Sequence, residues 1–101
     1  MNKIVKENIE ALKTLCSVYH VKSLYAFGSV CTDKFNSNSD IDLLVSFDSM
    51  DYSDYADAYL ELAEKLENLL RHPVDLITDK SLNNPYFIES VNQTKVPIYE
   101  N

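Results

Sequence analysis

Apolar residues recur every three to four positions in two stretches of the chain, the pattern of helices that bury one face. The first stretch predicts a helix from about Lys3 to Tyr19, and the second predicts a longer helix from Tyr55 to Leu70. Their apolar positions are Ile4, Val5, Ile9, Leu12, Leu15, Cys16 and Tyr19, and Tyr55, Tyr59, Leu62, Ala63, Leu66, Leu69 and Leu70. Pro73 ends the second helix, because a proline moves the residue before it out of helical geometry.

Short apolar runs between these helices predict strands. The runs are Lys22–Phe27, Asp40–Phe47 and Val74–Ile77, with a short edge strand at Val96–Tyr99. Helices that alternate with strands indicate an α/β fold in which helices pack on one central, mixed sheet of three to four strands.

Two finer features concern the helices. Glu61 with Lys65, and Glu67 with Arg71, have the four-residue spacing of ion pairs on a helix surface. Pro85 fits the first turn of a last helix, because that position needs no amide hydrogen.

Composition agrees with one folded unit, residues 1–101, since 46% of the residues are hydrophobic and 25% are charged. No apolar run approaches the roughly 18 residues of a membrane span, and the charged N-terminus does not resemble a signal peptide. Cys16 and Cys31 lack the spacing of a zinc site, and we expect neither a zinc site nor a disulfide. These features favour a location of the protein in the cytoplasm.

The charge balance limits the partners. Sixteen acidic and nine scattered basic residues give a net charge of −7. A nucleic acid is repelled by such a chain, so we expect no nucleic-acid partner. Phosphates of small molecules stay accessible to an acidic protein that recruits divalent metal ions.

Asp40 and Asp42 interrupt an otherwise apolar strand. Alternate residues of a strand point to the same side, about 6.5–7 Å apart, whereas Ile41 and Leu43 point to the core. Two carboxylates placed this way repel each other, and a bound divalent cation would compensate for the repulsion. The alternative is that both lie exposed and without function at a frayed strand start.

Asp75 is an acidic residue inside the third apolar run, between Val74 and Leu76. It could be an exposed edge position that discourages aggregation. If its strand lies beside the Asp40–Asp42 strand, three carboxylates converge on one patch.

Gly28 and Ser29 follow the first predicted strand. A glycine turn allows close approach of the backbone, and amides at a helix start attract phosphate. The Ser29 hydroxyl could donate to such a phosphate or simply cap a helix.

The run GSVCTDKFNSNSDIDLLVSF joins these features. Gly-Ser, ten residues and Asp-x-Asp resemble the signature of the minimal nucleotidyltransferases of the DNA polymerase β superfamily, the MNT antitoxin group. The resemblance implies a polymerase-β-like fold in which Gly28 and Ser29 hold a nucleoside triphosphate. It also implies that Asp40, Asp42 and Asp75 are the catalytic carboxylates, which bind two magnesium ions.

Thr32 departs from the family pattern. Relatives often carry an arginine there, and Lys34 follows two residues later as a candidate contact to the nucleotide. The departure keeps a second function open, a non-catalytic binding module that neutralises a partner by contact.

The resemblance also implies the reaction and the partner. AMP would pass from ATP to a hydroxyl of a HEPN-type helical toxin, for which this chain is the antitoxin. The chain's length accounts for the catalytic core, so we expect another protein to present the acceptor. The sequence predicts no membrane partner, and it leaves homo-oligomers open.

Overall fold

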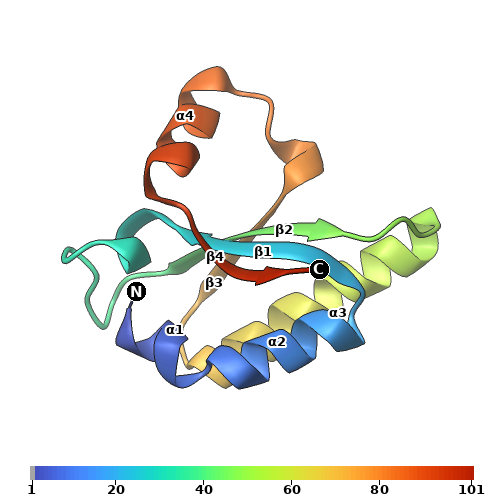
Figure 1. Ribbon diagram of the computed structural model, residues 1–101, viewed down its shortest axis with the longest axis horizontal. Coiled ribbons are helices and arrows are strands. Elements are labelled where there is room, and N and C mark those ends of the chain that lie inside the picture. The colour runs from blue at the N-terminus through green and yellow to red at the C-terminus, as the bar shows by residue number, and fades with distance from the viewer. Residues whose placement is uncertain (1) are drawn as a thin grey trace.

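A four-stranded mixed sheet forms the centre of the molecule (Figure 1). The structure, a computed structural model, describes residues 2–101. The strands are β1 (Val21–Phe27), β2 (Ile41–Phe47), β3 (Val74–Thr78) and β4 (Val96–Glu100), in the order β3-β2-β1-β4. β1 pairs antiparallel with β2 and with β4, whereas β2 and β3 are parallel. The predicted α/β fold with a mixed, helix-packed sheet is confirmed.

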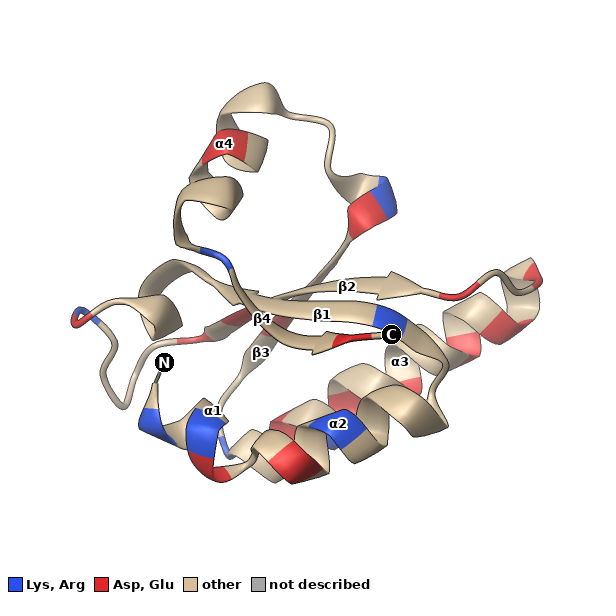
Figure 2. Ribbon diagram, in the orientation of Figure 1, with Lys and Arg blue, Asp and Glu red and all other residues tan. Residues whose placement is uncertain are grey.

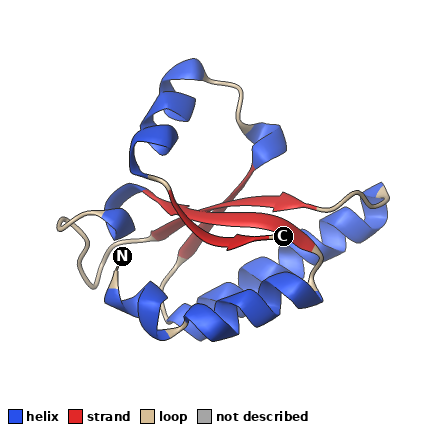
Figure 3. Cartoon of the chain, viewed as in Figure 1, coloured by secondary structure: helices blue, strands red, loops and turns tan. Residues whose placement is uncertain are grey.

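Helices lie on both sides of this sheet (Figure 3). α1 (Lys3–Glu7), α2 (Ile9–Val18) and α3 (Tyr52–Leu70) lie on one side, and α4 (Pro85–Thr94) stands over the other (Figure 1). Two 3-10 turns complete the chain, η1 (Gly28–Cys31) after β1 and η2 (Asp79–Ser81) after β3. No helix within residues 2–101 is long and apolar enough to cross a membrane.

The first predicted helix is wrong at Asn8, where the chain breaks into α1 and α2. Asn8 has φ −108° and ψ 13°, outside helical values. Its side-chain amide donates to the carbonyl oxygen of Ile4 at 2.8 Å. Asparagine competes in this way for backbone groups of a helix, which explains the break.

The main core lies between the sheet and the pair α2 and α3. Ile41, Leu43 and Val45 of β2 are completely buried there, as the alternation of the strand predicts. Leu12 of α2 and Leu62 of α3 are completely buried in the same cluster. The opposite face of β2 therefore carries Asp42.

Side chains of α3 cover the outer edge of β3. A carboxylate oxygen of Glu67 accepts from the Val74 amide at 2.9 Å, and the Tyr59 hydroxyl donates to the Leu76 carbonyl oxygen at 2.6 Å. These bonds satisfy edge groups of β3 that could otherwise pair with another chain.

The two predicted ion pairs of α3 are not formed. The ion pairs found within residues 2–101 are Lys3–Glu7 and Glu10–Lys13. Glu67 binds β3 instead, and Arg71 has left the helix in a left-handed conformation with φ 60°. Arg71 therefore lies beyond the last helical residue, outside the regular four-residue spacing that the ion pair needs.

The predicted start of the last helix is confirmed. Pro85 occupies the first turn of α4, and the Asn84 side-chain oxygen accepts from the amides of Tyr86 and Phe87 at 2.9 and 3.3 Å. Asn84 thus caps the helix.

Candidate active site

Gly28 brings the turn after β1 against a carboxylate of β2. Its φ is +73°, a conformation that glycine adopts without strain. A Cβ atom at this position would lie 2.5 Å from Oδ2 of Asp42. Only a residue without a side chain permits this close approach.

Asp42 and Asp75 stand opposite each other on neighbouring strands. β2 and β3 are paired so that Asp42 is in register with Asp75, and Phe27 of β1 is the partner of Asp42 on the other side. Neighbouring strands lie about 4.8 Å apart, and residues in register share a face. The predicted adjacency of the two strands is thereby found, on the face that α4 covers.

The pKa of Asp42 shows the electrostatic cost of this arrangement. Burial raises the pKa of its carboxyl group, and the negative charges of Asp75 and then Asp40 raise it further. A positive ion beside Asp42 would relieve both the desolvation and the repulsion.

Asp40 lies just outside the strand. β2 begins at Ile41, and Asp40 is exposed in the preceding loop, although its charge still reaches Asp42. Within residues 2–101, no group of three or more histidine, cysteine, aspartate or glutamate side chains is close enough together to hold a metal ion. Of the three carboxylates that we expected to converge, Asp42 and Asp75 are brought together by the strand register, and Asp40 is not.

The donors present nevertheless fit magnesium. Carboxylate oxygens are the hard ligands that this ion prefers, and the half-buried Asp42 carries an uncompensated repulsion. Asp42 and Asp75 would be its ligands on the sheet, and Asp40 would join them only if its loop brought it closer than it lies in this structure.

Ser29 lies in the η1 turn beside these carboxylates. The helix-cap role considered for it is not seen, because the N-cap residue of η1 is Phe27 and no side chain caps it. The Ser29 carbonyl oxygen accepts from the Thr32 amide and hydroxyl, both at 3.0 Å. The turn is thus held by the amide and the hydroxyl of Thr32, and the half-buried Ser29 hydroxyl does not cap a helix.

Thr94 is a residue of the candidate site that the sequence did not reveal. Its hydroxyl oxygen accepts from the Gly28 amide at 3.0 Å, which joins the end of α4 to the Gly28 turn. The two residues are 66 positions apart, so no local pattern could have indicated the contact.

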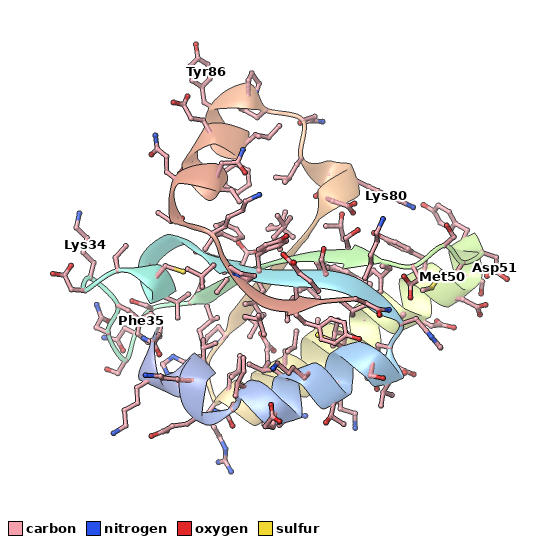
Figure 4. The ribbon with its side chains drawn as sticks, in the orientation of Figure 1. Lys34, Phe35, Met50, Asp51, Lys80 and Tyr86 are labelled. Carbon is pink, nitrogen blue, oxygen red and sulfur yellow. The ribbon has the colours of Figure 1, made fainter. Side chains whose placement is uncertain are left out.

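Lys34 is not brought beside the carboxylates. It follows Thr32 in the loop after η1, where its amide donates to the Thr32 hydroxyl at 3.2 Å. Figure 4 shows the Lys34 side chain pointing away from the sheet at the outer end of this loop. Its contact with a nucleotide stays a prediction.

A cavity of about 650 Å³ lies at the other end of the sheet, beside His20 and the residues after β2. Its lining includes Asp48 and, from α3, Asp54, Asp57 and Glu61, in a region rich in acidic positions (Figure 2). Such a lining repels phosphates. The Gly28 end of the sheet, where a backbone turn closely approaches Asp42 and Asp42 is in register with Asp75, is the candidate site for a nucleotide with its metal ions.

Known proteins are similar to this chain both in sequence and in fold. The family model described as a nucleotidyltransferase domain matches residues 5–97. A Methanocaldococcus jannaschii protein named "Putative protein adenylyltransferase" is 44% identical over 81 residues, which are 80% of each chain.

Two solved structures extend the likeness to the fold. One, described as a "putative minimal nucleotidyltransferase", superimposes with a TM-score of 0.73 at 30% identity, and the match covers 96% of each chain. The other is a toxin–antitoxin with AMP-PNP, with a TM-score of 0.71 at 27% identity over 93% of this chain and 74% of that one. The chain therefore belongs to the nucleotidyltransferase domain family, among the minimal nucleotidyltransferases, and is an adenylyltransferase enzyme.

Proposed function

We propose that this enzyme uses magnesium to transfer AMP from ATP to a hydroxyl group of a partner protein, as the antitoxin of a HEPN-type toxin. The observation that carries the proposal is the close approach of the Gly28 turn to Asp42, which stands in register with Asp75. The turn that we expect to bind phosphate and two carboxylates that we expect to bind metal are thereby next to each other.

Each residue has a role that its position supports. The amide and hydroxyl of Ser29 would hold phosphate oxygens, whereas the Gly28 amide is bonded to Thr94. Asp42 and Asp75, with Asp40, would hold the magnesium ions. Bound magnesium supplies neutralisation of phosphate charge and a lower pKa of the acceptor hydroxyl.

The transfer itself is a single displacement. The acceptor oxygen forms a bond to the α-phosphorus, the bond from that phosphorus to the bridging oxygen breaks, and pyrophosphate leaves. The hydroxyl proton passes to the carboxylate of Asp75, which is exposed on its strand and accessible to an incoming partner. No covalent intermediate with the enzyme is required.

A toxin partner is supported by one of the structural neighbours, a toxin–antitoxin that contains AMP-PNP. The net charge of −7 favours a basic partner surface, because complementary charge accelerates association and suppresses wrong partners. The partner that we propose is therefore a helical HEPN-type toxin with a basic docking surface.

Transfer of label tests the proposal. The enzyme is incubated with ATP labelled at the α-phosphate, magnesium and the product of the neighbouring gene, and Asp42→Asn serves as the matched inactive variant. Label on the partner protein with wild type alone is the expected result. Label on RNA or on a small alcohol, and none on the partner, would reject the protein acceptor. Neutralisation of the partner without any label would instead favour the contact-only module.

Metal binding has its own test. Titration of magnesium or manganese in the presence of a non-hydrolysable ATP analogue should release heat with wild type and much less with Asp42→Asn. Equal, negligible heats for both proteins would contradict the metal site.

A further inference from the structure

Lys95 lies in the same lateral row of the sheet as the candidate catalytic carboxylate Asp42. β4 pairs with β1 so that Val96 is opposite Ala26, and the preceding Lys95 is therefore next to Phe27. Phe27 is in turn the register partner of Asp42. With about 4.8 Å between strands, the backbone of Lys95 is roughly 10 Å from that of Asp42.

A hydrogen bond fixes this segment against the nucleotide-binding turn. Thr94, the residue before Lys95, accepts from the Gly28 amide at 3.0 Å. Lys95 itself ends α4 as its C-cap residue, with its amide bonded to the Val91 carbonyl oxygen. The base of the lysine side chain is therefore held beside the turn from which Ser29 projects.

The ammonium group lies on the same face of the sheet as the carboxylates. It is 5.0 Å from the centroid of the Tyr25 ring. Tyr25 is two residues before Phe27 on β1, so the two rings share a face, and Asp42 shares that face as the partner of Phe27. Lys95 is exposed and takes part in neither of the ion pairs found within residues 2–101. A lysine side chain has four flexible carbons and can leave the ring for a stronger partner.

Other basic residues are poorly placed for this task. Figure 4 shows Lys34 and Lys80 at opposite ends of the molecule, with Lys34 pointing outwards. Lys80 is engaged at the other end of the sheet, where its ammonium is 4.7 Å from the Tyr55 ring centroid. Thr32 provides no charge in the η1 loop. A polyanionic nucleotide beside Asp42 and Asp75 would be bound more tightly if the protein added a cation to the metal ions, and Lys95 is on the required face.

We propose that Lys95 is a specificity-determining residue that binds the β- or γ-phosphate of the nucleotide and so selects nucleoside triphosphates over monophosphates. The inference rests on the proposed function, because it takes the Gly28–Ser29 turn as the nucleotide site. On binding, the ammonium exchanges the face of Tyr25 for phosphate oxygens, which form stronger, charge-assisted hydrogen bonds.

Nucleotide binding to Lys95 variants tests this assignment. Affinities for AMP-PNP and for AMP are measured with magnesium for wild type, Lys95→Met and Lys95→Arg. Lys22→Met is the matched control, since it removes the same charge from an exposed position at the other end of β1. Lys95→Met should weaken AMP-PNP binding about tenfold or more and AMP binding less than twofold. Lys95→Arg should restore most of the affinity, and Lys22→Met should match wild type.

Two results would overturn the inference while the proposed function stands. In one, Lys95→Met binds AMP-PNP as tightly as wild type does. In the other, it loses affinity for AMP and AMP-PNP equally and unfolds at a lower temperature, as expected if Lys95 only packs on Tyr25. If wild type itself binds neither nucleotide, the proposed function fails, and the role of Lys95 fails with it.

Discussion

Gly28 decides, at the scale of a single residue, whether the turn and the carboxylate can approach. Gly28→Ala should cost about 1–2 kcal/mol of unfolding free energy from its positive φ alone. It should also abolish nucleotide binding, since its Cβ would displace Asp42 from the position 2.5 Å away. Denaturant unfolding and titration with AMP-PNP measure the two effects.

Gly28→Asn separates these two causes. Asparagine tolerates a positive φ better than alanine does, but it carries the same Cβ atom. We expect Gly28→Asn to be more stable than Gly28→Ala and equally unable to bind nucleotide. Nucleotide binding by either variant at wild-type affinity would show that the close approach to Asp42 is unnecessary.

Asp42 should make stability depend on pH. Its pKa is raised above 3.8 in the folded protein, so the native state holds the proton more tightly than the unfolded state does. The free energy of unfolding then falls as the pH rises from 3.8 through the raised pKa, and the full cost is present at neutral pH. Asp42→Asn removes this cost.

In a chelating buffer at pH 7, Asp42→Asn should therefore be more stable than wild type, on the order of 0.5 kcal/mol because solvent screens a half-exposed site. The advantage should disappear below pH 3.8, and the variant should be inactive. Urea unfolding at several pH values measures the difference. A variant that is less stable than wild type at pH 7 would show that the Asp42 carboxylate is not repelled in the fold.

Residues of the candidate site differ in how far the sequence alone indicates them. Asp42, Asp75 and Gly28 were identified because an acid inside an apolar strand, or a single glycine at a strand end, conflicts with its local surroundings. Thr94 and Lys95 do not conflict with theirs, since a polar residue and a lysine are ordinary at a helix end. They lie near Gly28 because β4, which follows them, pairs with β1, which precedes Gly28.

At the scale of elements, local periodicity predicted the strands closely and could not predict their order. The strand predicted at Val74–Ile77 is Val74–Thr78, and the one predicted at Val96–Tyr99 is Val96–Glu100. Which strands are neighbours is decided by contacts between distant segments, such as β2 with β3 across the whole of α3. From the sequence alone, Asp42 and Asp75 could therefore be expected to be neighbours only if their two strands were adjacent in the sheet.

The edge of β3 provides a test at this scale. Tyr59→Phe removes the hydroxyl that donates to the Leu76 carbonyl oxygen, next to Asp75 in the chain. We expect the unfolding free energy to fall by about 1 kcal/mol, the net contribution of one such bond. Chemical denaturation measures it.

Tyr55→Phe is the matched control on the same helix. The Tyr55 hydroxyl is buried with no hydrogen-bond partner within residues 2–101, and its ring packs on Phe47 with centroids 5.2 Å apart. Removal of an unsatisfied buried hydroxyl should leave stability unchanged or raise it. Equal losses for both variants would mean that the bond to Leu76 contributes nothing specific.

Across the whole molecule, the two faces of the sheet are unequally buried. The core under α2 and α3 contains most of the fully buried side chains. On the active-site face, the buried cluster consists of Phe27, Leu44 and Val91, with partly buried Tyr25, Ile77 and Leu82 around it. α4 contributes Val91 alone to the buried part of this cluster. It also meets this face through Phe87, whose ring centroid is 6.0 Å from that of Phe27, and through Thr94.

The smaller buried cluster on the α4 side predicts that α4 unfolds locally while the rest of the protein stays folded. In native-state hydrogen exchange, amides of α4 should exchange at a lower opening free energy than those of α3 and β2, because local stability follows buried apolar contact. Val91→Ala should lower the opening free energy of α4 by roughly 2 kcal/mol and leave α3 little changed. Leu62→Ala, in the main core, should instead accelerate amide exchange throughout the protein.

An α4 as protected from exchange as α3 would show that the small cluster and the Thr94–Gly28 bond hold α4 as firmly as the main core holds α3. If α4 does open alone, AMP-PNP should slow its exchange, since by the proposed function the nucleotide would bind the Gly28 turn to which Thr94 is attached.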